Sequence, residues 1–243
     1  MNGELLALVM TTHIIALGGS LLRPEEAEKR VQWFGQLRQM SVLMEGNDRK
    51  LGFVIGGGLP AREGIEIAKT NLSDSYKLDM VGIAATRLNA TIIQQMLLDI
   101  GCNVSMTIPT TTDEAAGMFE SNNIVVMGGT TPGHTTDAVA VALARDSGAS
   151  YCVIATNVSH VYDSDPKKNP SAQPIEELTH DELLKITGDE PLKPGQSAAV
   201  DPVAVRWASE SGIRIAVLDG RDIQNLEDAI EGKEFSGTLV NSE

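Results

Sequence analysis

Residues 127–137 read Met-Gly-Gly-Thr-Thr-Pro-Gly-His-Thr-Thr-Asp, and this stretch joins a predicted strand to a predicted helix. The run just before it, Asn-Ile-Val-Val-Met at 123–127, is apolar and β-branched, which predicts the strand. Residues 138–145 follow a helical pattern. A loop of small residues at the start of a helix offers free backbone N–H groups beside hydroxyls. The stretch therefore predicts a site for an anion or another polar small molecule.

Strands and helices alternate along the rest of the chain. Apolar runs predict strands at 13–17, 51–55, 104–108, 124–127, 151–156, 214–218 and, at a sheet edge, 237–240. Helical spacing and capping signals predict helices at 24–44, 59–69, 75–100, 113–119, 138–145, 179–186, 200–211 and 222–231. This alternation predicts an α/β fold, a three-layer αβα sandwich with a mainly parallel central sheet. We expect residues 1–243 to form a single domain.

The composition indicates an aliphatic core and an acidic surface. Hydrophobic residues make up 42% of the 243 residues, but aromatic residues only 4%. The formal net charge is −14 at pH 7, which opposes binding to nucleic acids and anionic membranes. No apolar run is long enough to span a bilayer. We therefore expect neither nucleic acid nor membrane among the partners.

Cysteine and histidine usage predicts no metal centre within the protein. The two cysteines form no Cys-x-x-Cys pattern, and the four histidines lack ligand spacing. Reduced thiols are typical of the cytoplasm, where we expect the protein to be. Residues 1–12 are apolar but lack the basic region and cleavage site of a signal peptide, and translation starts at either Met1 or Met10.

Three predicted strands end in glycine-rich loops: Gly18-Gly19-Ser20, Gly56-Gly57-Gly58 and Gly128-Gly129-Thr130. The carboxyl ends of parallel strands line one crevice, so we expect these loops to converge. Glycines let backbone amides approach an anion closely, although any one of the loops could equally be a tight turn. The fingerprints of dinucleotide-binding proteins, P-loop kinases and serine hydrolases are absent from the sequence.

Taken together, the motifs resemble those of the amino acid kinase family, over about residues 13–240. The stretch at 127–137 is most similar to the archaeal-type UMP kinase branch. The motifs are Gly18-Gly19-Ser20, Gly56-Gly57-Gly58 with Ala61-Arg62, Thr86-Arg87-x-Asn89-Ala90, residues 127–137, Thr156-Asn157-Val158 with Val161-Tyr162 and Asp165-Pro166, and Asp201-Pro202. The resemblance implies transfer of the γ-phosphoryl group of ATP to UMP, giving UDP in pyrimidine nucleotide synthesis, with Mg²⁺ as cofactor. Such a transfer depends on in-line placement and charge neutralisation.

The same resemblance implies a division of labour along the chain and an assembly. Residues of about 13–150 would form the acceptor lobe for UMP, and about 151–243 the ATP-binding lobe. Family members form homo-hexamers, trimers of dimers, whose dimers pack through the helix after the first strand. The apolar residues at 31–44, including Trp33 and Phe34, are the only sequence sign of such packing. Feedback by UTP is a further expectation from the resemblance.

On the acceptor side, the resemblance assigns roles residue by residue. Gly57 and Gly58 would face the transferred phosphoryl group. Arg62 would bind the UMP phosphate and take part in catalysis, with a surface ion pair as the alternative. Asp79 would bind the ribose hydroxyls, with an ordinary exposed helix charge as the alternative.

Residues 127–137, called the opening stretch from here on, would recognise UMP and carry the catalytic carboxylate. Thr130, Thr135 and Thr136 would read the uracil edge and the α-phosphate, since hydroxyls suit both carbonyl acceptors and N–H donors. Helix capping is the alternative role for these threonines. Asp137 would be catalytic by orienting the donors around the reacting phosphoryl group; its alternative is a surface carboxylate that complements the helix dipole.

On the ATP side, the first glycine loop and the segment after residue 156 would hold the nucleotide. Gly19 and Ser20 would be catalytic beneath the transferred phosphoryl group. Tyr162 could equally be an ordinary packing aromatic. Lys167, Lys168 and Lys193 are candidate phosphate-binding cations. The full set of expected ATP-binding residues is Gly18, Gly19, Ser20, Thr156, Asn157, Tyr162, Asp165 and Pro166.

The sequence departs from the family pattern in three places. Many members have a lysine two residues before the first glycine pair, where this chain has Ala16, and the second catalytic lysine has no match near Asp201. The usual Asp-Gly of the ATP loop is Ser159-His160. Charge neutralisation would then rest on Mg²⁺, backbone amides, Arg62 and Lys193. Two alternatives stay open: another small-substrate kinase of this fold, and a non-catalytic protein that binds nucleotide or an oxyanion.

Overall fold

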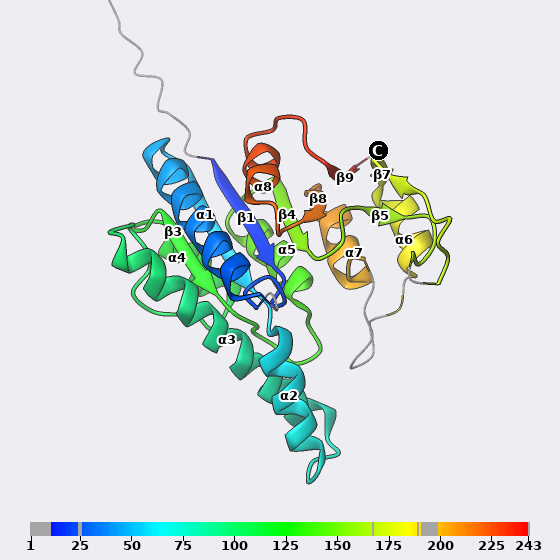
Figure 1. Ribbon diagram of the computed structural model, residues 1–243, viewed down its shortest axis with the longest axis horizontal. Coiled ribbons are helices and arrows are strands. Elements are labelled where there is room, and N and C mark those ends of the chain that lie inside the picture. The colour runs from blue at the N-terminus through cyan, green and yellow to red at the C-terminus, as the bar shows by residue number, and fades with distance from the viewer. Residues whose placement is uncertain (1–10, 24–25, 167, 189, 191–198, 243) are drawn as a thin grey trace, which may run out of the picture.

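A seven-stranded sheet forms the middle layer of the protein (Figure 1). The computed structural model describes residues 11–23, 26–166, 168–188, 190 and 199–242. The strand order is β3-β2-β1-β4-β8-β9-β7, and every neighbouring pair is parallel except β8 and β9. The strands are β1 (Thr12–Leu17), β2 (Lys50–Ile55), β3 (Ile124–Met127), β4 (Tyr151–Thr156), β7 (Glu177–Thr179), β8 (Arg214–Asp219) and β9 (Gly237–Asn241). The predicted mainly parallel sheet is confirmed.

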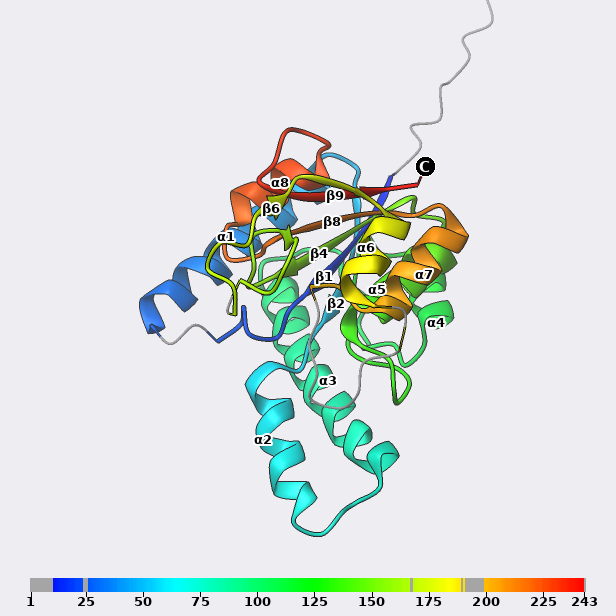
Figure 2. The ribbon, with the colours of Figure 1, turned by 90° about the vertical axis from the view of Figure 1, so that its right-hand side faces the viewer.

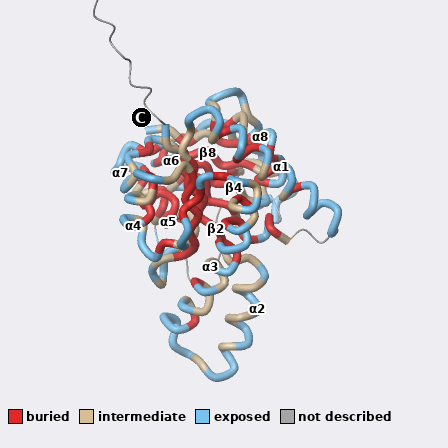
Figure 3. The backbone as a smooth tube through the Cα atoms, turned by 90° about the vertical axis from the view of Figure 1, so that its left-hand side faces the viewer, coloured by how far each residue is buried: buried red, intermediate tan, exposed pale blue. Residues whose placement is uncertain are grey.

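Helices cover both faces of this sheet and complete the three layers (Figure 2). Because successive strand residues point to opposite faces, Ile15 and Leu17 pack on one side, whereas Ile14 and Ala16 pack on the other. The first face is covered by α1 (Ala27–Gly46), α3 (Ser75–Asp99) and α8 (Ile223–Ile230). The second is covered by α4 (Thr112–Met118), α5 (Thr136–Asp146), α6 (His180–Thr187) and α7 (Pro202–Ser211). Figure 3 shows the buried strands enclosed by helices whose outer sides are exposed.

One helix pair extends away from this body. The helix α2 (Gly58–Lys69) packs along the first half of α3, and both project beyond the carboxyl ends of the strands (Figures 1 and 2). None of the residues of α2 is buried. This projection forms one wall of the space into which the glycine loops open.

A small antiparallel ribbon lies beside the outer strands. It pairs β5 (Val161–Tyr162) with β6 (Pro174–Ile175). The hydroxyl of Thr238, in β9, accepts a bond from the N–H of Val161 (2.8 Å) and donates to the carbonyl of Ile175. Thr238 is wholly buried, so β9 fastens the ribbon to the main sheet.

One predicted strand is absent, and another lies at a different place in the sheet. Residues 104–108 form no strand: Val104 makes an isolated bridge with Ile124, and pairing ends because the Ser105 carbonyl accepts a bond from Gln94 (2.8 Å) while Met106 turns out to solvent. The strand predicted at the sheet edge near residue 240 lies one place inside it, because β7 pairs along its outer side.

The other predicted elements are confirmed to within a few residues. The capping box at the start of α6 is present: Thr179 and Glu182 exchange side-chain to backbone bonds of 2.8 and 3.2 Å. The predicted helix start at Pro24, the loop at 188–197 apart from Gly188 and Glu190, and the question of Met1 or Met10 concern residues outside the described ranges. Within those ranges, no helix is long and apolar enough to cross a membrane.

Candidate active site

The glycine loops meet as predicted, because β1, β2 and β3 are neighbours in the sheet. A Cβ atom on Gly19 would lie 2.3 Å from the backbone N of Gly58, and one on Gly58 would lie 2.4 Å from the carbonyl O of Gly19. Gly58 also has a φ of +58°, which L side chains rarely adopt. The first and second loops are therefore in direct backbone contact, and only glycine fits at either position.

Two polar side chains of α3 hold the loops in place. The amide of the wholly buried Asn89 donates to the carbonyls of Gly56 (2.7 Å) and Gly57 (3.0 Å). The hydroxyl of Thr86 accepts a bond from the N–H of Gly129 (2.7 Å). Both residues belong to a motif that the chain shares with the amino acid kinase family, but the sequence alone predicted no role for either. Their spacing of three residues, which places both on one helix face, was the available signal.

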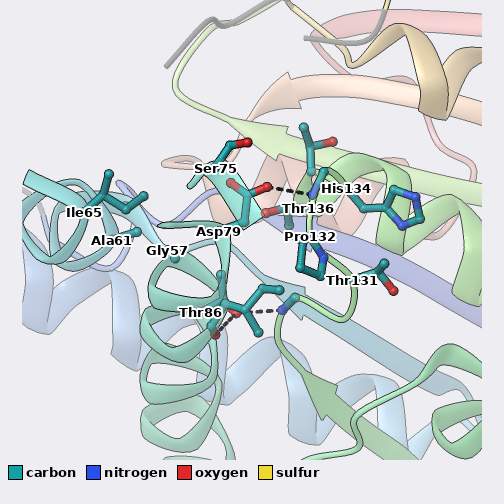
Figure 4. Close-up of a pocket in the computed structure, with 16 residues that line it drawn as sticks. Gly57, Ala61, Ile65, Ser75, Asp79, Thr86, Thr131, Pro132, His134 and Thr136 are labelled. Carbon is teal, nitrogen blue, oxygen red and sulfur yellow. Dashed lines mark hydrogen bonds between the residues drawn. The ribbon is translucent and has the colours of Figure 1, made fainter. Parts of the chain in front are cut away.

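A cavity of about 590 Å³ opens between the α2–α3 projection and the opening stretch (Figure 4). Apolar and small side chains from the helix pair face polar groups of the stretch. Five residues predicted to bind the acceptor line it: Gly57, Gly58, Asp79, Thr135 and Thr136. Other lining residues include Ala61, Ile65, Ser75, Ile83, Thr131, Pro132 and His134.

The carboxylate of Asp79 is directed at the opening stretch rather than at solvent. Its Oδ2 accepts a bond from the backbone N–H of Gly133 (2.8 Å), as the dashed line in Figure 4 marks. This bond closes the cavity on one side by joining α3 to the loop. Asp79 is therefore more than an exposed helix charge.

The threonines divide between capping and lining. Thr135 is the N-cap of α5: its hydroxyl accepts from the Ala138 N–H (3.3 Å) and donates to the carboxylate of Asp201 (2.5 Å). Because Thr135 also lines the cavity, the capping role is confirmed without removing it from the candidate site. Thr136 lines the cavity too, whereas Thr130 lies outside the lining residues.

Asp137 lies in the first turn of α5, where it meets the start of α7. Its Oδ2 accepts a bond from the backbone N–H of Asp201 (3.3 Å). Burial raises the pKa of Asp137 to about 6; the N–H of Asp201 opposes this rise in pKa, and the Asp201 carboxylate adds to it. Asp137 is thus a partly buried carboxylate rather than an exposed charge at a helix end.

Asp201 is the site residue whose position sequence reasoning missed. It is only 2% exposed and caps α7 by accepting a bond from the N–H of Val203 (2.9 Å). With its bonds to Thr135 and Asp137, it joins α7 to the opening stretch. A second link is an edge-on contact between the rings of His134 and Trp207, whose centroids are 5.1 Å apart. The Asp-Pro pair near the start of the predicted helix was the available signal for the cap, but it does not indicate the bonds to Thr135 and Asp137.

Arg62 is not brought to the cavity. Its side chain is exposed on α2 and lies outside the lining residues. Within the described residues it also has no ion pair, so the alternative of a surface ion pair is wrong there.

Of the expected ATP-binding residues, Gly18 and Thr156 lie at the end of β4. The N–H of Gly18 bonds to the carbonyl of Ala155 (2.9 Å), which places the first glycine loop beside the end of that strand. The hydroxyls of Tyr162 and Ser159 are 3.0 Å apart, so Tyr162 has a polar partner as well as a packing role. Thr156 is half-buried at the end of β4, whereas Asn157, Asp165 and Pro166 are exposed.

Cations on this side are few among the described residues. Lys168 pairs with Asp165 at 3.5 Å. Lys167 and Lys193 lie outside the described ranges. A cation that sequence reasoning missed is Arg221, which pairs with Asp219 and lies 3.4 Å from the carbonyl of Asn157.

This fold and site define an α/β protein whose strand ends carry glycine loops in backbone contact beside a cavity. The sequence profile described as "Amino acid kinase family" matches residues 11–219. The chain belongs to the amino acid kinase family.

The chain is similar over nearly its whole length to proteins named uridylate kinase or UMP kinase. The chain is 36% identical over 228 residues to a uridylate kinase of Methanococcus aeolicus, covering 94% of this chain and 98% of the relative. It is 38% identical over 232 residues to a uridylate kinase of Methanospirillum hungatei, covering 95% of each. The crystal structure of uridylate kinase from Archaeoglobus fulgidus superimposes with a TM-score of 0.79 at 32% identity, covering 95% of this chain and all of the other. A UMP kinase structure from Ureaplasma parvum, at 22% identity, shares the fold with a TM-score of 0.75.

Proposed function

We propose that this chain is a UMP kinase that transfers the γ-phosphoryl group of ATP to UMP, producing UDP and ADP for pyrimidine nucleotide synthesis. The observation that carries the proposal is the cavity that joins the threonine-rich stretch to the glycine loops. Its volume of about 590 Å³ suits a ligand of nucleotide size. Membership of the family, and relatives named uridylate kinase over nearly the whole chain, support the choice of acceptor.

We assign the acceptor lobe to residues of about 13–150. The backbone N–H groups of Gly57 and Gly58 open α2 and would bind the phosphate of UMP. Asp79 would bind the ribose, and Thr130, Thr135 and Thr136 would read the base and phosphate. Arg62 would bind the same phosphate only if its exposed side chain turned toward the cavity.

We assign the donor lobe to residues of about 151–243. The first glycine loop lies beside the end of β4, which supports placing the ATP phosphates across Gly18, Gly19 and Ser20. The remaining contacts would come from the segment after β4. They comprise Thr156, Asn157, Tyr162, Asp165 and Pro166.

Mg²⁺ would arrive with ATP. Asp137 offers a partly buried carboxylate in the first turn of α5, next in sequence to Thr136, which lines the cavity. One or two carboxylates are what Mg²⁺ bound to nucleotide phosphates commonly takes from a protein. The site therefore fits this ion, which would neutralise phosphate charge. Asp137 itself would orient the donors around the reacting group.

Phosphoryl transfer depends more on positioning the two nucleotides in line than on covalent catalysis by the protein. A phosphate oxygen of UMP attacks the γ-phosphorus of ATP, and the bond from that phosphorus to the β,γ-bridging oxygen breaks, so ADP leaves. The contact between Gly19 and Gly58 would bring the two nucleotides' phosphates together over one short stretch of backbone. N–H groups there would stabilise the charge of the transition state.

We also propose homo-oligomers, with a hexamer as the family expectation, in the cytoplasm. Trp33 does not support the α1 contact, because it is buried and donates to the carbonyl of Gly220 (2.8 Å). Exposed apolar residues on α1 and α3 do support association. They are Val31, Val42 and Leu43 on α1, and Tyr76, Met80, Leu88 and Ile92 on α3. Two buried free thiols support a reducing compartment.

The test is an ADP-release assay with MgATP and a panel of acceptors: UMP, CMP, dTMP, AMP and acetylglutamate. Turnover with UMP well above the rest is expected. Preference for another acceptor would indicate a different small-substrate kinase of this fold. Binding of UMP without turnover would favour the non-catalytic alternative, which the buried Ala16 in place of a lysine supports.

A further inference from the structure

Arg23 is connected to the glycine loops through a single side chain, and no role has been assigned to it above. It lies three residues after Ser20, the last residue of the first loop, and its backbone N–H bonds to the carbonyl of Ser20 (3.2 Å). Its guanidinium Nη1 donates to Oδ1 of Asn89 (2.8 Å). The side chain is half-buried beside the wholly buried Asn89.

The orientation of the Asn89 amide is determined by its partners. Nδ2 donates to two backbone carbonyls, those of Gly56 and Gly57, and these can only accept. The guanidinium of Arg23 can only donate, so it must face the amide oxygen. Asn89 therefore links the guanidinium of Arg23 to the carbonyls of Gly56 and Gly57 in one chain of hydrogen bonds.

The chain continues through two peptide groups to the cavity. The peptide bonds here are trans, so the N–H groups of Gly57 and Gly58 point away from the carbonyls that Asn89 holds. Gly57 and Gly58 both line the cavity. As the first N–H groups of α2 they have no acceptor within the helix and are free to bind an anion.

We propose that Arg23 is a positioning residue for the phosphoryl site. Through Asn89 it fixes and polarises the two peptide groups whose N–H groups face the phosphate, and so it supplies part of the positive charge expected from a lysine at the position of Ala16. The proposal rests on the proposed kinase function. Arg23 contacts neither nucleotide; it acts through the backbone of the second glycine loop.

Charge-assisted hydrogen bonds are stronger than neutral ones, and bonds in a chain polarise one another. Both effects grow with the negative charge at the far end of the chain. The link should therefore stabilise the transition state more than bound UMP, and its loss should lower kcat more than it weakens UMP binding.

The experiment compares Arg23→Met and Arg23→Lys with Arg38→Met. Arg38 is a matched control on α1, 41% exposed and only 3.8 Å from the exposed Asp99. For each variant, kcat and the KM values for UMP and MgATP are measured, with UMP affinity by calorimetry and thermal stability. We expect Arg23→Met to lose roughly 10- to 100-fold in kcat. UMP affinity should change by less than about fivefold, and Arg23→Lys should keep most of the rate.

If the bond between Arg23 and Asn89 only stabilised the fold, the variants would behave differently. If Arg23→Met and Arg23→Lys lose stability and activity to the same extent, or if Arg23→Met keeps the wild-type kcat, the proposal is overturned. Should Arg23→Met not fold, Arg23→Ala assayed with millimolar guanidinium serves instead: recovery of rate supports the proposal, and no recovery by a folded variant refutes it.

The two proposals fail in different ways. A wild-type chain that turns over none of the acceptors refutes the kinase function. A wild-type chain that phosphorylates UMP while Arg23→Met matches it in kcat refutes only the role of Arg23.

Discussion

The two sides of the candidate site are held by different kinds of contact. On the proposed acceptor side, the backbone of Gly58 meets that of Gly19 in the first loop, and the buried Asn89 and half-buried Thr86 of α3 fasten the second and third loops. On the donor side, exposed side chains such as Asp163 and Asn169 fasten the segment between β5 and β6. Buried polar contacts cost more to break than exposed ones. The acceptor side should therefore be rigid and intolerant of change, and the donor side adaptable.

The largest effect should come from Gly19→Ala. The added methyl group would lie 2.3 Å from the backbone N of Gly58, so the two loops must separate. We expect kcat/KM to fall about 1,000-fold or more, and unfolding free energy to drop by about 1–3 kcal/mol. Gly35→Ala is the control, since a Cβ there meets nothing within 4 Å on an exposed helix face. Near wild-type kinetics for Gly19→Ala would show that catalysis does not depend on the contact between the first and second glycine loops.

Next in size is Asp137→Ala. If Asp137 orients donors in the transition state, kcat should fall roughly 100- to 1,000-fold while UMP affinity, measured by calorimetry, stays within about threefold. Parallel losses in kcat and affinity would instead make Asp137 a binding residue. A variant with wild-type rates would exclude any part for it in the reaction.

The carboxylate of Asp137 also predicts a pH dependence. Its pKa is raised to about 6, chiefly by burial, so the group is protonated below that pH and ionised above it. If the ionised form is the active one, kcat of the wild type should fall as the pH drops through about 6. The same raised pKa favours folding at low pH, because the folded protein must ionise a partly buried group as the pH rises.

A smaller effect is expected for Asp201→Asn. The amide keeps a hydrogen-bonding group toward Thr135 and Val203 but removes the negative charge that helps raise the pKa of Asp137. The acid limb of the kcat profile should move to lower pH, and kcat at pH 8 should fall no more than about tenfold. An acid limb that stays at the wild-type pH would show that the Asp201 charge does not act on Asp137.

The smallest effects compare one bond from each side. Thr86→Val removes the acceptor of the Gly129 N–H and should cost about 1–3 kcal/mol of stability, with a few-fold rise in the KM for UMP. Asn169→Ala removes an exposed acceptor of the Ser171 N–H and should cost less than about 0.5 kcal/mol. Denaturant unfolding measures both. Equal costs would remove the distinction between the two sides.

Most of the fold could be predicted from the sequence because its signals are local. Apolar runs ending in glycine marked β1, β2 and β3, and their convergence followed from parallel pairing. The strand prediction for residues 104–108 failed because an apolar run has the same sequence pattern whether or not another strand pairs with it. What removed this strand was a bond between Gln94 and Ser105, which no local pattern contains.

The residues that line the cavity could be predicted from the sequence, but the side chains that hold the loops in position could not. Gly57, Gly58, Asp79, Thr135 and Thr136 line the cavity as expected. The bond from Thr135 to Asp201 spans 66 residues, and that from Asn89 to Gly56 spans 33, so local spacing identifies the partner of neither. Arg62 was placed by its distance from the glycines, but its side chain points outward.

The position of β9 has a consequence for how the chain matures. Strands β3, β2, β1 and β4 can pair as soon as they are synthesised, and β8 can then join β4. Strand β7 has to wait for β9, its neighbour in the sheet, which follows it by more than fifty residues. Until then β8 presents an unpaired edge, and the β5–β6 ribbon lacks the hydroxyl of Thr238 that fastens it. The growing chain should therefore be most prone to aggregation in this interval, after its acceptor half has already folded.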